Sequence, residues 1–190
     1  MPRLSPVLSA ADLPLAELHA ARLDGELTPL DACFTPMDIP PSPLHRAAAL
    51  AVQWPERLIA EQRTAAWVWG ALWQPPSRHE LCSSLGARAR PTEPLRVVAR
   101  EVAISDDEVV TLSGLRVTTP ARTIADLARF AREVDSAQLG VMRSLAAIGG
   151  VTLDDCRAAL DRRRNLPNKI VAWQRIVAAL APQHPRVSPS

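Results

Sequence analysis

The densest cluster of side chains that could do chemistry is the acidic run Asp106-Asp107-Glu108. Carboxylates at this density can bind a divalent metal ion, as a metal-dependent nuclease requires. Such a nuclease would also need an acid-x-Lys pair near a strand, and the only lysine, Lys169, lies in a region with a helical pattern. We therefore expect the three acids to form a solvated turn. A degenerate nuclease-like domain is the least favoured of the alternative functions.

Histidine and cysteine show no spacing typical of metal ligands. These residues are His19, His45, His79 and His184, with Cys33, Cys82 and Cys156. The sequence also lacks the usual nucleophile, phosphate-loop and dinucleotide motifs. We expect no metal site, no cofactor and no catalytic residue, and we interpret the chain as a protein that is not an enzyme.

Three tryptophans, Trp67, Trp69 and Trp73, gather in the run from Thr64 to Trp73. Aromatic rings can stack on nucleic-acid bases, but exposed stacking platforms usually alternate with basic residues, and this run has none. The spacing therefore favours a buried helix with Thr64 as its N-cap.

The stretch from Thr118 to Ala128 predicts a strand-to-helix junction, with Thr119 as N-cap and Pro120 at the first helical position. Arg122 and Asp126 are four residues apart and are expected to pair on the helix surface. The alternative is that Arg122 is offered to a phosphate. Upstream, Ser113-Gly114 is typical of a two-residue hairpin turn.

Charge is distributed unevenly along the chain. Residues 1–60 carry four Arg and seven acids, whereas residues 151–190 carry seven basic groups and three acids. The Thr152 to Asp155 segment predicts a capped helix start, and Arg162-Arg163-Arg164 is expected at the end of that helix, where cations suit the helix dipole. Phosphate binding by this triplet, helped by Lys169 and Arg175, is the alternative interpretation.

Length and composition indicate an ordinary globular protein. The 190 residues are 47% hydrophobic, 22% charged and carry a formal charge of +2, which excludes wholesale disorder. No apolar run approaches the roughly 20 residues of a membrane span, and the first residues lack the pattern of a signal peptide. We expect a cytoplasmic protein without a membrane partner.

The element pattern predicts an α+β fold: a short N-terminal winged-helix-like unit followed by a mixed sheet with packed C-terminal helices. Asp12 is expected to cap a helix that Gly25 ends, before one or two strands over residues 27–34. The expected organisation is a truncated winged-helix-turn-helix-like unit over residues 1–36, a Pro-rich linker over 37–43, a core over 44–181 and a flexible tail over 182–190. Within the core we expect strands at about residues 79–118 and helices at about 120–132, 136–148, 152–164 and 168–181.

The central part of the sequence resembles the AbiEi-type antitoxins of actinobacteria. The resemblance rests on the stretches RTAAWVWGAL, HELC and LRVVAREVAISDDEVVTLSGLRVTTPARTIADLAR. It covers about residues 8–181, and the family signature is matched by Gly114, Leu115, Val117, Thr118, Arg122, Thr123, Asp126, Leu127 and Ala128. Of these, we expect Gly114, Thr118, Arg122, Thr123 and Asp126 to be structural.

The resemblance implies a cytoplasmic winged helix joined to an antitoxin domain. It implies a repressor that binds double-stranded DNA at its own promoter and that counters a co-encoded nucleotidyltransferase toxin. The residues expected to contact DNA are Arg3, His19, Arg22, Arg162, Arg163, Arg164, Lys169 and Arg175. Because the N-terminal unit is short and net acidic, either the basic C-terminal helices contact DNA or that unit is degenerate. The alternative function is a protein-interaction module that neutralises a toxin without binding DNA, and a homodimer is left open.

Overall fold

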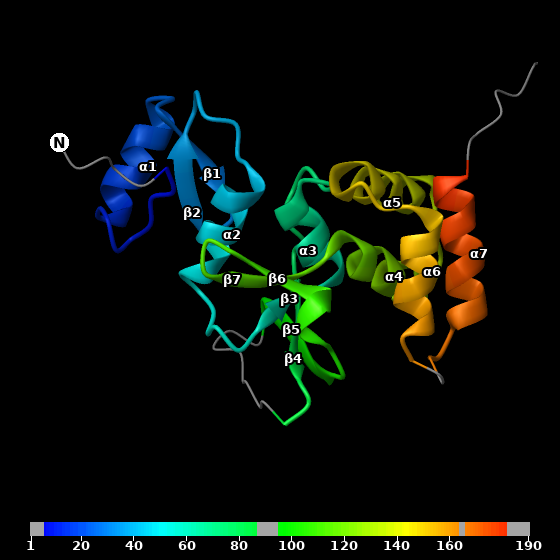
Figure 1. Ribbon diagram of the computed structural model, residues 1–190. Helices are drawn as coiled ribbons and strands as arrows, with labels where there is room; N and C mark the ends of the chain where they lie inside the picture. The colour runs from blue at the N-terminus through cyan, green and yellow to red at the C-terminus, as the bar shows by residue number, and fades with distance from the viewer. Residues whose placement is uncertain (1–5, 87–94, 164–165, 182–190) are drawn as a thin grey trace, which may run out of the picture. The chain divides into compact units, whose positions relative to one another are not determined.

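The computed structural model describes residues 6–86, 95–163 and 166–181 (Figure 1). The chain divides into two compact units, Met1–Thr119 and Pro120–Ser190. The predicted DNA contacts Arg3 and Arg164 and the predicted tail 182–190 lie outside the described residues. The predicted division into a unit, a linker and a core stays a prediction.

The first unit begins with helix α1 (Leu15–Leu23) and the antiparallel hairpin β1 (Leu27–Leu30) and β2 (Cys33–Pro36). Their apolar side chains form a small cluster made of Leu8, Leu18, Leu27 and Phe34. The prediction that Asp12 caps α1 is wrong, because Pro14 occupies the N-cap. The Asp12 carboxylate instead accepts hydrogen bonds from the backbone N–H and the hydroxyl of Ser9, at 2.8 and 2.9 Å.

A mixed sheet of five strands forms the centre of the first unit. Its strands are β3 (Ile59–Ala60), β4 (His79–Ser84), β5 (Val97–Val102), β6 (Val109–Leu112) and β7 (Leu115–Thr118), in the order β5-β4-β3-β7-β6. The β4–β5 and β3–β7 pairs are parallel, and the other two pairs are antiparallel. Four of these strands were expected from the sequence. The fifth, β3, has only two residues, which is too short to show an alternating pattern.

Helices α2 (Pro43–Ala51) and α3 (Gln62–Trp69) pack on this sheet and against each other. Trp67 is buried in the core, as predicted, but Trp73 is 89% exposed, so its assignment to the core was wrong. Thr64 is likewise not the N-cap of α3, because Glu61 occupies that position. The Thr64 hydroxyl instead accepts a hydrogen bond from the Glu80 N–H at 2.8 Å and so ties α3 to β4.

The second unit is helical, with α4 (Pro120–Phe130), α5 (Ser136–Gly149), α6 (Leu153–Asp161) and α7 (Lys169–Leu180). Helix α4 packs against each of the other three, and its residues 122–129 are all buried. Thr152 and Asp155 form the predicted capping box at the start of α6. The α+β class predicted from the sequence is confirmed.

Candidate functional site

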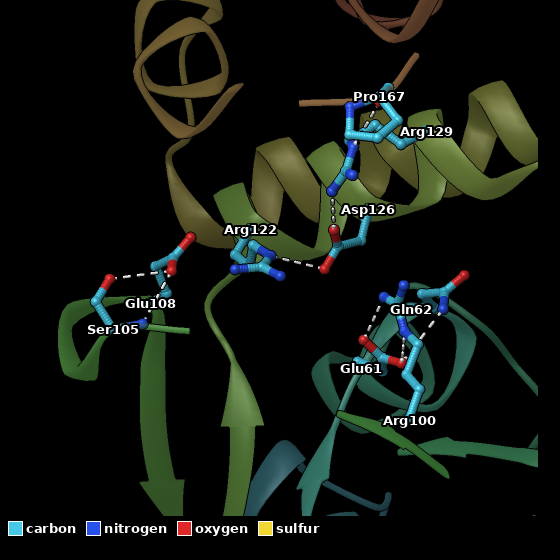
Figure 2. Close-up of polar contacts among 9 residues, drawn as sticks. All are labelled: Glu61, Gln62, Arg100, Ser105, Glu108, Arg122, Asp126, Arg129 and Pro167. Atoms are coloured by element: carbon cyan, nitrogen blue, oxygen red, sulfur yellow. Dashed lines mark hydrogen bonds and ion pairs between the residues drawn. The ribbon is translucent and has the colours of Figure 1, made fainter. Parts of the chain in front are cut away.

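Helix α4 carries a buried ion-pair network built from the signature residues. Arg122 donates from Nε to Asp126 Oδ2 at 2.7 Å, and Arg129 donates from Nη1 to Asp126 Oδ1 at 3.2 Å (Figure 2). The side chains of Arg122, Asp126 and Arg129 are 4%, 1% and 8% exposed. The expected Arg122–Asp126 pair therefore exists, but its predicted place on the helix surface was wrong. Sequence reasoning also missed Arg129, although its spacing of three residues from Asp126 was a usable signal.

A side chain of α7 closes the C-terminal end of α4. Arg175 donates hydrogen bonds to the carbonyl oxygens of Ala128, Ala131 and Arg132 at 2.8, 2.9 and 3.2 Å. These carbonyls are at or just beyond the last turn of α4, where helical partners are missing. Arg175, predicted as a DNA contact, thus has a structural role in the helix end, and a contact with DNA stays a prediction.

The remaining signature residues shape the hairpin before α4. Ser113 and Gly114 have φ values of +44° and +84°, which a two-residue turn of this kind requires. Thr118 and Thr123 are fully buried, and the Thr118 carbonyl accepts a hydrogen bond from the Trp69 indole N–H at 2.9 Å. Burial and turn geometry give these positions structural contacts, and the structural role expected of them from the sequence stays a prediction.

The acidic run forms a short 3-10 turn, η1 (Asp106–Glu108). Glu108 is 3% exposed, so its predicted place in a solvated turn was wrong. Its carboxylate accepts hydrogen bonds from the Ser105 N–H and hydroxyl at 3.1 and 3.0 Å (Figure 2). Glu108 thus closes a turn, which is a sufficient structural reason for a buried carboxylate there.

A second buried acid, Glu61, links the end of β3 to the edge strand β5. Both of its carboxylate oxygens accept hydrogen bonds from Arg100, from Nε and Nη2, at 2.6 and 2.6 Å (Figure 2). The two residues are 39 positions apart in the chain, so no local pattern could have predicted the pair. Because Arg100 occupies both carboxylate oxygens, Glu61 is poorly placed to act as a general base.

Four cations lie within α6, just after its end and at the start of α7, and we call them the α6–α7 cation cluster: Arg157, Arg162, Arg163 and Lys169. Arg162 is the C-cap of α6. Lys169 donates to Asp161 at 2.5 Å, and this hydrogen bond, opposed by desolvation and helped by the charges of Lys169 and Arg157, lowers the pKa of Asp161. Arg157 lies over the Trp173 ring, 4.9 Å from its centroid.

The cluster has the charge of an anion-binding surface. It contains four cations, and the Asp161 carboxylate lies beside two of them, Lys169 and Arg157. Sequence reasoning named three of these cations and missed Arg157, whose spacing of four residues from Asp161 places both on the same face of α6.

The predicted contacts on α1 lie in an acidic setting. His19 packs edge-on against Phe34, with ring centroids 5.4 Å apart, and Arg22 is exposed. Glu17, Asp24 and Glu26 are also exposed on α1 and the turn after it. Helix α1 therefore offers little positive potential to a phosphate backbone.

Within the described ranges, no group of three or more His, Cys, Asp or Glu side chains could hold a metal ion. Burial raises the pKa of the Cys156 thiol to about 11, so this cysteine is a poor nucleophile. No helix in the same ranges has the length and apolarity that crossing a membrane requires.

The mixed sheet with its two helices and the helical unit that follows define an α+β protein with buried ion pairs at structural positions. Residues 58–147 match the AbiEi antitoxin C-terminal domain, a range that takes in β3 to β7, α3, α4 and most of α5. This match supports the AbiEi-type antitoxin family that the sequence indicated.

The fold is also similar to a crystal structure of the RV2827C protein from Mycobacterium tuberculosis. The two chains are 16% identical with a TM-score of 0.50, over 93% of this chain and 71% of that one. No curated protein sequence matches this chain.

Proposed function

We propose that this antitoxin is a non-enzymatic repressor that binds double-stranded DNA at its own promoter, and that the α6–α7 cation cluster contacts the phosphate backbone. The observation that carries the proposal is the cluster itself, in which Arg162, Arg163 and Lys169 lie between the end of α6 and the start of α7. Arg157, within α6, packs against the Trp173 ring of α7. Arginine and lysine at such a surface bind phosphates and release the counterions condensed on DNA.

The acidic surroundings of α1 favour this assignment of the phosphate contacts. In a winged-helix-like unit the recognition helix would approach the DNA groove. Here Glu17, Asp24 and Glu26 outnumber Arg22 on the exposed residues of α1 and its following turn. The backbone contacts that provide most of the affinity therefore fall to the C-terminal helices, and α1 has at most an accessory role.

A gel-shift titration on the DNA upstream of the protein's own gene tests the proposal. We expect retardation at about 50 mM salt that weakens steeply as salt rises. The variant Arg162→Glu with Arg163→Glu should bind more weakly while keeping its circular dichroism spectrum. The matched control, Arg57→Glu with Arg132→Glu, changes the net charge equally at two exposed positions elsewhere in the chain. Absence of any retardation of the wild-type protein, or equal decreases in affinity in the two variants, would contradict the proposal.

The acidic surface of α1 supports a second candidate function, a module that neutralises a cognate nucleotidyltransferase toxin by direct contact. Acidic side chains complement a basic protein surface better than they complement DNA. Co-purification with the toxin encoded beside this protein's gene distinguishes the two functions. A stable complex without promoter binding would support the interaction module.

A further inference from the structure

Asp31 occupies the turn of the β1–β2 hairpin, yet its side chain is only 3% exposed. Its Oδ1 atom accepts hydrogen bonds from Arg96 Nη2 at 2.9 Å and from His79 Nε2 at 3.1 Å. Its Oδ2 atom accepts a hydrogen bond from Gln53 Nε2 at 2.9 Å. A turn carboxylate is ordinarily left in water, because burying it unpaired is costly. The Asp31 carboxylate instead accepts hydrogen bonds from three side chains of the protein.

The donors come from three separate parts of the first unit. Gln53 follows α2, His79 is the first residue of β4, and Arg96 directly precedes β5. His79 is itself 1% exposed, with its Nδ1 atom 3.4 Å from the Thr64 hydroxyl and its ring 4.8 Å from that of Trp54. The receiving site is therefore held in place by the sheet and its helices.

The apolar side chains of the hairpin belong to two different clusters. Leu30 and Cys33, on either side of the turn, belong to the main core of the unit together with Leu50 and Trp67. Leu27, at the start of β1, and Phe34, which follows Cys33 in β2, belong to the small cluster that also contains Leu18 of α1. The hairpin therefore contributes side chains both to the sheet's core and to the cluster that holds α1.

We propose that the β1–β2 hairpin is an intramolecular docking element in which Asp31 is the positioning residue that holds α1 on the five-stranded sheet. The turn is then unavailable as a DNA-reading wing. A loop that reads DNA must expose its tip to the phosphates, whereas Asp31 at this tip is buried. Its negative charge would also be repelled by the phosphates. The docking itself does not depend on whether the protein binds DNA.

Thermal unfolding of the full chain tests the docking energetics. Asp31→Asn should lower the unfolding midpoint by about 5–10 °C, since it removes the charge that Arg96 faces in a largely buried site. Asp38→Asn, at an exposed acid that follows the hairpin, is the matched control and should shift it by less than about 2 °C. Arg96→Gln should lower the unfolding midpoint much less in the Asp31→Asn background than in the wild type. Additive effects of the two substitutions would overturn the proposal.

Hydrogen exchange separates positioning from a general decrease in stability. In Asp31→Asn we expect amides of residues 27–36 to exchange about tenfold faster, with α5 to α7 unchanged. Uniform acceleration across the chain would overturn the proposal. If Asp31→Ala fails to fold, the milder Asp31→Asn and Arg96→Gln variants still decide the question.

A DNA titration is a further test of the docking element, and this test rests on the proposed function. If the turn were a wing, removing its negative charge in Asp31→Asn would raise the affinity for the upstream DNA. If the hairpin is a docking element, Asp31→Asn should not raise the affinity for the upstream DNA. An increase in this affinity would overturn the proposal. If the wild-type protein binds no DNA, the proposed function fails, whereas the exchange result still tests the docking element.

Discussion

Asp126 is the residue whose burial matters most to its neighbours, because two guanidinium groups depend on it. Arg122 and Arg129 are both buried against its carboxylate, at 2.7 and 3.2 Å. Replacing a buried ion pair with apolar groups can be neutral, but removing one partner leaves the other charge without compensation. We therefore expect α4 to be sensitive to the loss of Asp126 alone.

We expect Asp126→Asn to lower the free energy of unfolding by about 3 kcal/mol, since it removes the negative charge that both buried arginines face. Urea denaturation followed by circular dichroism measures the change. Asp154→Asn, at an exposed position in the first turn of α6, is the control and should cost less than about 0.5 kcal/mol. Similar decreases in the two variants would show that the network contributes little.

Asp31 predicts a dependence of stability on acid pH. Burial by itself would raise the pKa of Asp31, but hydrogen bonds from His79 and Gln53 and the charges of His79 and Arg96 lower it to about 2 from 3.8. A folded-state pKa below the unfolded value stabilises the protein above about pH 4, and this stability is lost as the pH falls toward about 2. The contribution is roughly 2 kcal/mol.

Urea unfolding at about pH 6 and about pH 2.5 measures this contribution of Asp31. It is the difference in the free energy of unfolding between the wild type and Asp31→Asn. We expect that difference to shrink at the lower pH. A difference that stays constant with pH would show that ionisation of Asp31 does not contribute to stability.

At the scale of elements, the end of α3 depends on one glycine. Gly70 has a φ of +94°, and an added Cβ would lie 2.9 Å from Arg46 Nη1. That same nitrogen donates to the Trp67 carbonyl at 3.0 Å and so satisfies the last turn of the helix. The left-handed backbone favours a residue without a side chain, and an added Cβ would also displace the Arg46 guanidinium.

Gly70→Ala should therefore lower the free energy of unfolding by about 1–2 kcal/mol. Gly140→Ala is the matched control, because Gly140 lies inside α5 with nothing within 4 Å of an added Cβ. That control should stabilise the protein by about 0.5–1 kcal/mol through its helix propensity. Thermal melts of both variants are sufficient, and a neutral Gly70→Ala would mean that Arg46 moves aside without cost.

At the scale of the whole molecule, the sign of charge differs between the exposed residues around α1 and the α6–α7 cation cluster. If the cluster binds phosphates, removing one cation–phosphate pair should reduce the slope of log affinity against log salt by about 0.9. We expect Arg162→Glu with Arg163→Glu to reduce the slope by about 2 between roughly 50 and 200 mM salt, by fluorescence anisotropy. The Arg57→Glu and Arg132→Glu control should keep the wild-type slope, and equal reductions would indicate a net-charge effect only.

Elements set by neighbouring residues could be predicted from the sequence. The Ser113-Gly114 turn, the Pro120 helix start and the Thr152–Asp155 capping box each depend on residues within four positions of one another. Propensity and local hydrogen bonds decide such features. The predictions for Asp12 and Thr64 were wrong because each side chain found a different backbone partner.

The sequence by itself determined the order and type of most elements, the start of α6 at its capping box and the asymmetry of charge between the two ends of the chain. Only the tertiary structure decided that Arg122 and Asp126 are buried, that Trp73 is exposed, and that Asp31 meets His79 from 48 positions away. The reason is that burial depends on which distant segments cover a residue. Desolvation then turns an ordinary surface pair or turn acid into a contact that holds the fold together.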